Sequence, residues 1–171
     1  APLIGYCLAA EALMYDASLF DLDGTLIDPE SIALVTGMAA FAAHGHDVDE
    51  AFMHALVGKD EPTAARMIRA ALPGVDLTAV NLHWRKGFND GVDNGLALKA
   101  GALDLLPALT APLAIVTSTG RIGAHRKLGI AGIAGAFQHV VTLDDVSAPK
   151  PDPEPYLLAT TLFGVSPARC L

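Results

Sequence analysis

Residues 19–28 read Leu19-Phe20-Asp21-Leu22-Asp23-Gly24-Thr25-Leu26-Ile27-Asp28. The segment Ala17–Phe20 is short and mostly apolar, which is typical of a buried strand. Residues i and i+2 of a strand point to the same side, so Asp21 and Asp23 can face one pocket. That pocket would lie at the carboxyl end of the strand, where open α/β sheets bind ligands. The alternative is an ordinary turn after a strand, because Asp and Gly are common turn residues.

Two carboxylates held this close repel each other unless a positive charge offsets them. A hard divalent cation with oxygen ligands is the natural candidate, and Mg2+ is the expected ion.

Polar residues also follow two later segments with strand character. Leu113–Val116 is a continuous apolar run that ends at Thr117, and Phe137–Thr142 is expected to form a third strand. Lys150 then lies in a loop with four prolines, which should hold it in one place. Strands that alternate with helices predict an α/β fold with a Rossmann-like parallel sheet, so these polar ends should converge. Carboxylates, a hydroxyl and a fixed cation suit phosphoryl transfer through a covalent aspartyl intermediate.

The composition narrows the class of protein. The chain has 171 residues, 52% of them hydrophobic, which allows one good core with a small accessory domain. The net charge is −8 and no basic run occurs, so nucleic acid and anionic membranes are not expected partners. Cys7 and Cys170 lack metal-type spacing, which favours a reducing, cytoplasmic protein. No apolar run is long enough to span a bilayer.

Between the first two strands lies a block with helical spacing and no strand signal. We expect a discontinuous core of residues 14–28 and 100–171, a helical domain of residues 29–99, and an extension of residues 1–13. Met14 could be the natural start, or the preceding residues could form a short helix packed on the core. The helices expected in the block are Ser31–Ala43, Asp47–Leu56, Thr63–Ala71 and Leu77 to about Asn89.

The motifs together resemble those of the haloacid dehalogenase-like superfamily, in its phosphatase and phosphomutase branch. Phe20–Leu26 is similar to the first motif of that family, Ile115–Ser118 to the second, and Lys150–Pro153 to the third. The helical insert lies where the family has a C1-type α-helical cap.

The resemblance implies a role for each motif residue. Asp21 would attack phosphorus, and Asp23 would act as the general acid and base. Mg2+ would be held by the Asp21 carboxylate and the Asp23 backbone carbonyl. Thr117 and the backbone N–H of Ser118 would bind the phosphoryl group, which Lys150 would neutralise.

Two further residues are candidates for substrate contacts. Asp28 could orient its loop or touch the substrate, and a simple turn role is equally open. Lys59 follows Gly58 in a turn where related enzymes place specificity residues, and an exposed lysine without that role is an equal alternative.

The resemblance predicts a Mg2+-dependent phosphatase that acts on a small phosphorylated metabolite of the phosphoglycolate or sugar-phosphate type. One alternative is a β-phosphoglucomutase-like enzyme, although those mutases have His at the position of Ala33. The other is a non-catalytic remnant or binding module of the same fold.

One departure concerns the family's fourth motif, an acidic pair after the next strand. Cys170-Leu171 is only the first step of that strand, so we expect the core to continue past Leu171. Asp144 and Asp145 precede Lys150 and are expected to be loop and helix-start residues. The missing strand would pair with the first one, which leaves the Leu19–Leu22 edge open. We expect the segment Ala1–Leu13 or another subunit to cover it, and the oligomeric state stays open.

Overall fold

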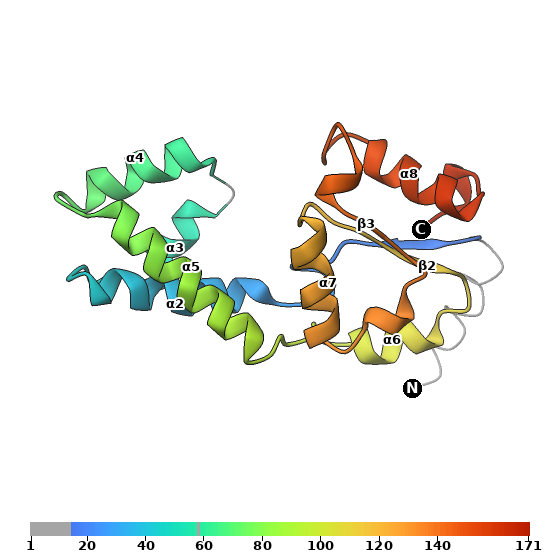
Figure 1. Cartoon of the computed structure of the whole chain (residues 1–171), viewed down its shortest axis with the longest axis horizontal. Helices are drawn as coiled ribbons and strands as arrows, with labels where there is room; N and C mark the ends of the chain where they lie inside the picture. Colours follow the sequence, from blue (N-terminus) through green and yellow to red (C-terminus); the bar gives the residue numbers. More distant parts are fainter. Residues whose placement is uncertain (1–14, 58) are drawn as a thin grey trace. The chain divides into compact units, whose positions relative to one another are not determined.

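A computed structural model describes residues 15–57 and 59–171 (Figure 1). The chain divides into two compact units. The first, here called the sheet unit, contains the residues up to Asp28 together with Leu96–Leu171. The second, the helical unit, is the segment Pro29–Gly95. Within the described ranges, no helix combines the length and the apolar character that crossing a membrane requires.

The sheet unit is built on three parallel strands in the order β1 (Ser18–Phe20), β2 (Leu113–Val116) and β3 (His139–Val141). Ser18 pairs with Leu113 and Ala114 pairs with His139. All four residues of β2 are buried, as expected for the central strand of a parallel sheet. The predicted α/β class with a parallel, Rossmann-like sheet is therefore confirmed.

Helices cover both faces of this sheet. Figure 1 shows α8 (Glu154–Phe163) on one side, with α6 (Ala102–Ala108) and α7 (Arg121–Ile130) on the other. A buried cluster of Val116, Val141 and Ala159 joins α8 to the two strands that it contacts. The described part of the unit also has three short 3-10 helices: η1 (Ala134–Ala136), η2 (Leu143–Asp145) and η3 (Pro167–Arg169).

The last residues of the chain lie against the outer edge of β1. The N–H of Leu19 donates to the carbonyl of Leu171 at 2.7 Å, and the N–H of Leu171 donates to Ala17 at 3.1 Å. Ala17 and Cys170 form a parallel bridge. The edge that we expected to be open is thus paired at Leu19, because the segment after η3 runs parallel to β1. The other expected cover, residues 1–13, lies outside the described residues.

The helical unit contains α2 (Pro29–Ala43), α3 (Glu50–Leu56), α4 (Glu61–Ala71) and α5 (Leu77–Asp93). Helices α3 and α4 begin at Glu50 and Glu61 and not at the expected Asp47 and Thr63, because an aspartate caps each of them. The Asp49 carboxylate accepts from the Phe52 N–H at 2.8 Å, so α3 begins after Asp49. The Asp60 carboxylate does the same for Thr63 at 2.9 Å, so α4 begins at Glu61.

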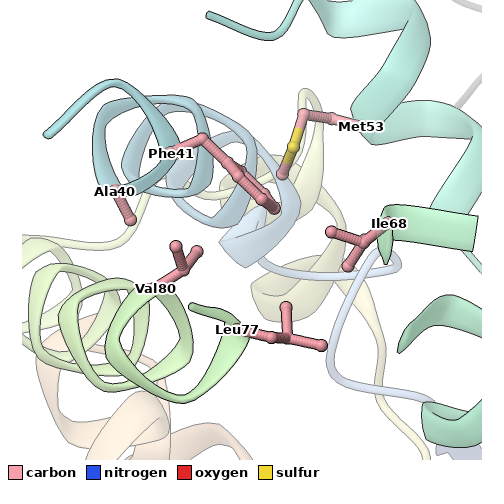
Figure 2. Packing of buried hydrophobic residues seen from close by; sticks show 6 residues of the cluster. All are labelled: Ala40, Phe41, Met53, Ile68, Leu77 and Val80. Atoms are coloured by element: carbon pink, nitrogen blue, oxygen red, sulfur yellow. The ribbon is translucent and has the colours of Figure 1, made fainter. Parts of the chain in front are cut away.

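One apolar cluster holds these helices together. Figure 2 shows its side chains pointing toward one another from α2, α3, α4 and α5. The rings of Phe41 and Trp84 lie 6.4 Å apart, and the indole N–H of Trp84 donates to the carbonyl of Ala33 at 2.9 Å. The cluster comprises Ala40, Phe41, Met53, Ile68, Leu77 and Val80.

The boundary after the helical unit also differs from the expected one. The unit ends at Gly95, whereas the sequence placed the boundary after residue 99. Ala97 and Leu98 already belong to the sheet unit, since the Ala97 carbonyl accepts from Asp28 and Leu98 forms a bridge with Ile27.

Helices α2 and α5 approach closely where α2 has a glycine. A Cβ atom at Gly37 would lie 2.7 Å from the Trp84 ring and 2.4 Å from Met53. A Cβ atom added at Gly129 in α7 would meet no neighbouring atom within 4 Å. The two helical glycines therefore contrast a crowded, buried position in α2 with an open, exposed one near the end of α7.

We predict that Gly37→Ala destabilises the helical unit by about 1–2 kcal/mol, because overpacking outweighs the better helix propensity of alanine. Gly129→Ala should instead stabilise the protein by about 0.5–1 kcal/mol. Urea unfolding measures the stability of both variants, and circular dichroism follows the unfolding of the whole chain. Fluorescence of the single tryptophan, Trp84, reports on the helical unit. Equal effects of the two substitutions would contradict the prediction.

Candidate active site

The loop after β1 carries Asp21, whose carboxylate meets a lysine from the other end of the sequence. The Nζ atom of Lys150 lies 2.8 Å from Oδ1 of Asp21, across a separation of 129 residues. The Asp21 side chain is 40% exposed, and the Lys150 side chain is 19% exposed. The carboxylate is thus paired with a cation and still open to a ligand.

Asp23 is held by two donors at once. The hydroxyl of Thr119 donates to Oδ2 at 2.6 Å, and the ammonium of Lys127 donates to Oδ1 at 2.7 Å. Thr119 comes from the loop after β2 and Lys127 from α7. Both carboxylate oxygens of Asp23 are therefore engaged by protein groups.

The loop after β2 begins with Thr117, which is 4% exposed. Its N–H donates to the carbonyl of Val141 at 2.9 Å and thereby extends the pairing of β2 with β3. Its hydroxyl oxygen accepts from the N–H of Thr119 at 3.1 Å. The same turn leaves Ser118 exposed at its apex, just before α7. Thr117 is therefore linked through Thr119 to Asp23.

The loop that carries Lys150 is fixed by its own side chains as well as by its prolines. The Glu154 carboxylate accepts from the N–H groups of Ser147 and Ala148, each at 2.8 Å. The Lys150 ammonium also lies 5.3 Å from the centre of the Tyr156 ring, a cation–π contact. These contacts aim the lysine at Asp21.

Asp144 and Asp145 hold η2 and the start of α7. The Asp144 carboxylate accepts from the N–H of Arg121 at 2.7 Å, and Asp145 forms an ion pair with the Arg121 guanidinium. The Asp145 carboxylate also accepts from the N–H and the hydroxyl of Thr142, at 2.9 and 2.6 Å. Both residues thus make loop and helix-start contacts.

The two candidate substrate residues lie in different units. Asp28 pairs with Lys99 at 3.1 Å, and its N–H donates to Ala97 at 3.0 Å. Lys59 belongs to the helical unit. Their substrate contacts stay predictions.

The oxygen donors fit a magnesium ion in type. The site offers one exposed carboxylate, Asp21, and the backbone carbonyl of Asp23, whose own carboxylate is occupied by Thr119 and Lys127. Mg2+ is commonly held by one or two carboxylates with water and phosphate oxygens completing the shell. Across residues 15–57 and 59–171, no three His, Cys, Asp or Glu side chains gather as a metal site.

Comparisons with known proteins place the chain in a family. A family model described as haloacid dehalogenase-like hydrolase matches residues 18–171. The chain therefore belongs to the haloacid dehalogenase-like hydrolases, as the sequence motifs predicted.

Several named relatives are phosphatases. N-acetylmuramic acid 6-phosphate phosphatase of Pseudomonas aeruginosa is 34% identical over 166 residues, which cover 91% of this chain and 71% of that protein. Validoxylamine A 7'-phosphate phosphatase of Streptomyces hygroscopicus is 31% identical over 165 residues, with coverages of 92% and 76%. Hexitol phosphatase A of Escherichia coli is 33% identical over 158 residues, with coverages of 90% and 71%. These relatives confirm an enzyme of the phosphatase class and support activity on phosphorylated metabolites.

Solved structures agree with the fold. A haloacid dehalogenase family hydrolase from Deinococcus radiodurans, with bound phosphate and sodium, superposes with a TM-score of 0.79 at 27% identity. That match covers 92% of this chain and 71% of the other.

Sequence reasoning missed two residues that contact Asp23. Thr119 follows the second motif, and its hydroxyl binds the carboxylate. Lys127 was not singled out, because a lysine among polar helical residues resembles any solvated helix face. Its place within α7, directly after the second motif, was the available signal.

The carboxylate of Asp145 provides a test of how this region is stabilised. Burial raises the pKa of Asp145, but the hydrogen bonds from Thr142 and the charge of Arg121 outweigh it and hold the pKa below 3.8. A carboxyl whose pKa is lower in the folded state stabilises the fold above its unfolded-state pKa. That stability is lost as the pH falls through the folded-state pKa.

We predict that Asp145→Asn lowers the stability at pH 7 by about 1 kcal/mol, the upper end for an ion pair at the protein surface. It should also flatten the loss of stability between about pH 5 and pH 2. Thermal unfolding across this range measures both effects, with Asp104→Asn at the start of α6 as the control. An unchanged pH profile would show that the carboxylate contributes nothing.

Proposed function

We propose that this protein is a Mg2+-dependent phosphomonoester hydrolase that works through a phosphorylated Asp21. The observation that carries the proposal is the pair of Lys150 and Asp21, 2.8 Å apart, with Asp21 40% exposed. A carboxylate nucleophile next to a fixed cation suits attack on a phosphoryl group, whose negative charge the cation offsets.

The first step would transfer the phosphoryl group to the enzyme. An oxygen of Asp21 attacks phosphorus, and the bond from phosphorus to the ester oxygen breaks. Asp23 gives its proton to the leaving oxygen, so an alcohol departs. Lys150 and Thr117 bind the phosphoryl oxygens, with the N–H of Ser118 as a further donor.

The second step would release inorganic phosphate. Asp23, now a carboxylate, takes a proton from water as the water attacks phosphorus. The bond between phosphorus and Asp21 breaks, which regenerates both aspartates. Bound Mg2+ would supply positive charge that binds the substrate and offsets the charge developing on the phosphoryl oxygens.

The names of the relatives support a substrate class. Two of them act on phosphorylated sugars or polyols, an N-acetylmuramic acid 6-phosphate and a hexitol phosphate. We therefore favour sugar or polyol phosphates over phosphoglycolate. Asp28 and Lys59 remain the proposed substrate contacts in addition to the phosphate site. Ala33 disfavours the mutase alternative, since those enzymes have His there.

We predict that Asp21→Asn lowers the Mg2+-dependent hydrolysis of p-nitrophenyl phosphate by at least about a thousandfold, because loss of a nucleophile removes the covalent route. Release of nitrophenol measures the rate without any bisphosphate primer. Asp90→Asn, in an exposed pair with Lys86 on α5, is the matched control and should be unaffected. Retention of more than a tenth of the activity by Asp21→Asn would refute the proposal.

We also predict that Lys150→Met lowers kcat/KM for the same ester by about 100- to 1000-fold, since it removes one preorganised contact to the transition state. Lys86→Met, which removes an exposed lysine from α5, should leave kcat/KM unchanged. An equally small effect of both substitutions would show that Lys150 does not bind the phosphoryl group.

A further inference from the structure

Lys127 makes a contact that none of the family motifs described above includes. Its side chain is 14% exposed, and its ammonium lies 2.7 Å from Asp23 across a separation of 104 residues. Lysine is seldom buried to this degree unless it is paired. The pair of Lys86 and Asp90 on one face of α5 has side chains that are 76% and 56% exposed. The Lys127 pair therefore differs from a surface ion pair in the burial of its lysine and in the sequence separation of its partners.

The two donors to Asp23 are chemically different. An ammonium group only donates hydrogen bonds, whereas a hydroxyl donates or accepts. Oδ1 therefore stays an acceptor while Lys127 is bound to it. Oδ2 faces the hydroxyl of Thr119, which donates to a carboxylate and can turn to accept from a carboxyl proton. The arrangement thus fixes Oδ1 on a cationic donor and Oδ2 on a hydroxyl that can donate or accept.

We propose that Lys127 is a positioning residue that holds the Asp23 carboxylate, together with Thr119, in the orientation that transfers a proton to the leaving oxygen. The inference rests on the proposed function, in which Asp23 is the general acid. Lys127 touches Asp23 and acts through it, while Lys150 and Thr117 serve the phosphoryl group itself. Without the ammonium, Oδ1 loses its fixed partner and the carboxyl group can rotate away from the ester oxygen.

The test compares two esters that differ in their need for an acid. The p-nitrophenolate of p-nitrophenyl phosphate leaves readily without a proton, whereas the alkoxide of sorbitol 6-phosphate or glycerol 3-phosphate does not. The parameter measured is kcat/KM, which covers the steps up to the departure of the alcohol. Loss of a positioned acid should therefore affect the alkyl esters far more than the aryl ester.

For Lys127→Met we expect kcat/KM for the alkyl esters to fall about 100-fold, with at most about a threefold fall for p-nitrophenyl phosphate. The second step also needs Asp23, so the variant should release one equivalent of nitrophenol per enzyme in a burst before slow turnover. Lys127→Arg keeps a cationic donor and should recover most of the alkyl activity. Lys86→Met is the control and should match the wild type with both esters.

Lys127→Gln provides a second measurement, because it keeps a neutral donor on a shorter stem. It should lower the ratio of alkyl to aryl kcat/KM about tenfold. Thermal unfolding of every variant checks that the fold is retained. If Lys127→Met does not fold, the ratio for Lys127→Gln decides the question.

The outcomes separate this inference from the proposed function. Parallel losses for both esters, or no loss for either, would overturn the role of Lys127 while Asp21→Asn remains inactive. A wild-type chain that hydrolyses neither ester, or an Asp21→Asn variant that stays active, would overturn the proposed function and this inference with it.

Discussion

The sheet unit depends on how it compensates two negative charges placed two residues apart. Asp21 and Asp23 follow one short strand, and their repulsion opposes the fold unless cations come close. Lys150 meets the first carboxylate at 2.8 Å and Lys127 meets the second at 2.7 Å. Each lysine comes from a different part of the chain, so the charge balance exists only when the sheet unit is assembled. Removing one lysine would leave its carboxylate, which is partly shielded from water, without its compensating charge.

The parallel sheet makes this meeting possible. Because β1, β2 and β3 run in the same direction, the loops after them emerge at one edge. The loop after β2 brings Thr117 and Thr119, and it leads directly into α7 with Lys127. The loop beyond β3 brings Lys150. A slip of the register between β1 and β2 would move Asp21 and Asp23 away from all of these partners.

Much of this arrangement could be predicted from the sequence. The apolar run Leu113–Val116 fixed the central strand, and the prolines around Lys150 marked it as a positioned lysine. The contact of Lys127 could not be predicted, because it depends on the rotation of α7 about its axis, and that of Thr119 depends on the path of the loop after β2. The helix starts at Glu50 and Glu61 were missed because the capping by Asp49 and Asp60 decides them. Local composition describes each segment, whereas these contacts arise only from tertiary packing.

The Glu154 carboxylate has a mechanical consequence for the site. Because it binds the backbone of Ser147 and Ala148, it ties the proline-rich loop to the first turn of α8. Helix α8 is in turn anchored to the sheet by the apolar cluster in which Ala159 packs on β2 and β3. A substitution that tilts α8 at this cluster would displace the ammonium of Lys150 at the far end. The position of Lys150 is thus set partly by hydrophobic packing about one and a half helical turns into α8.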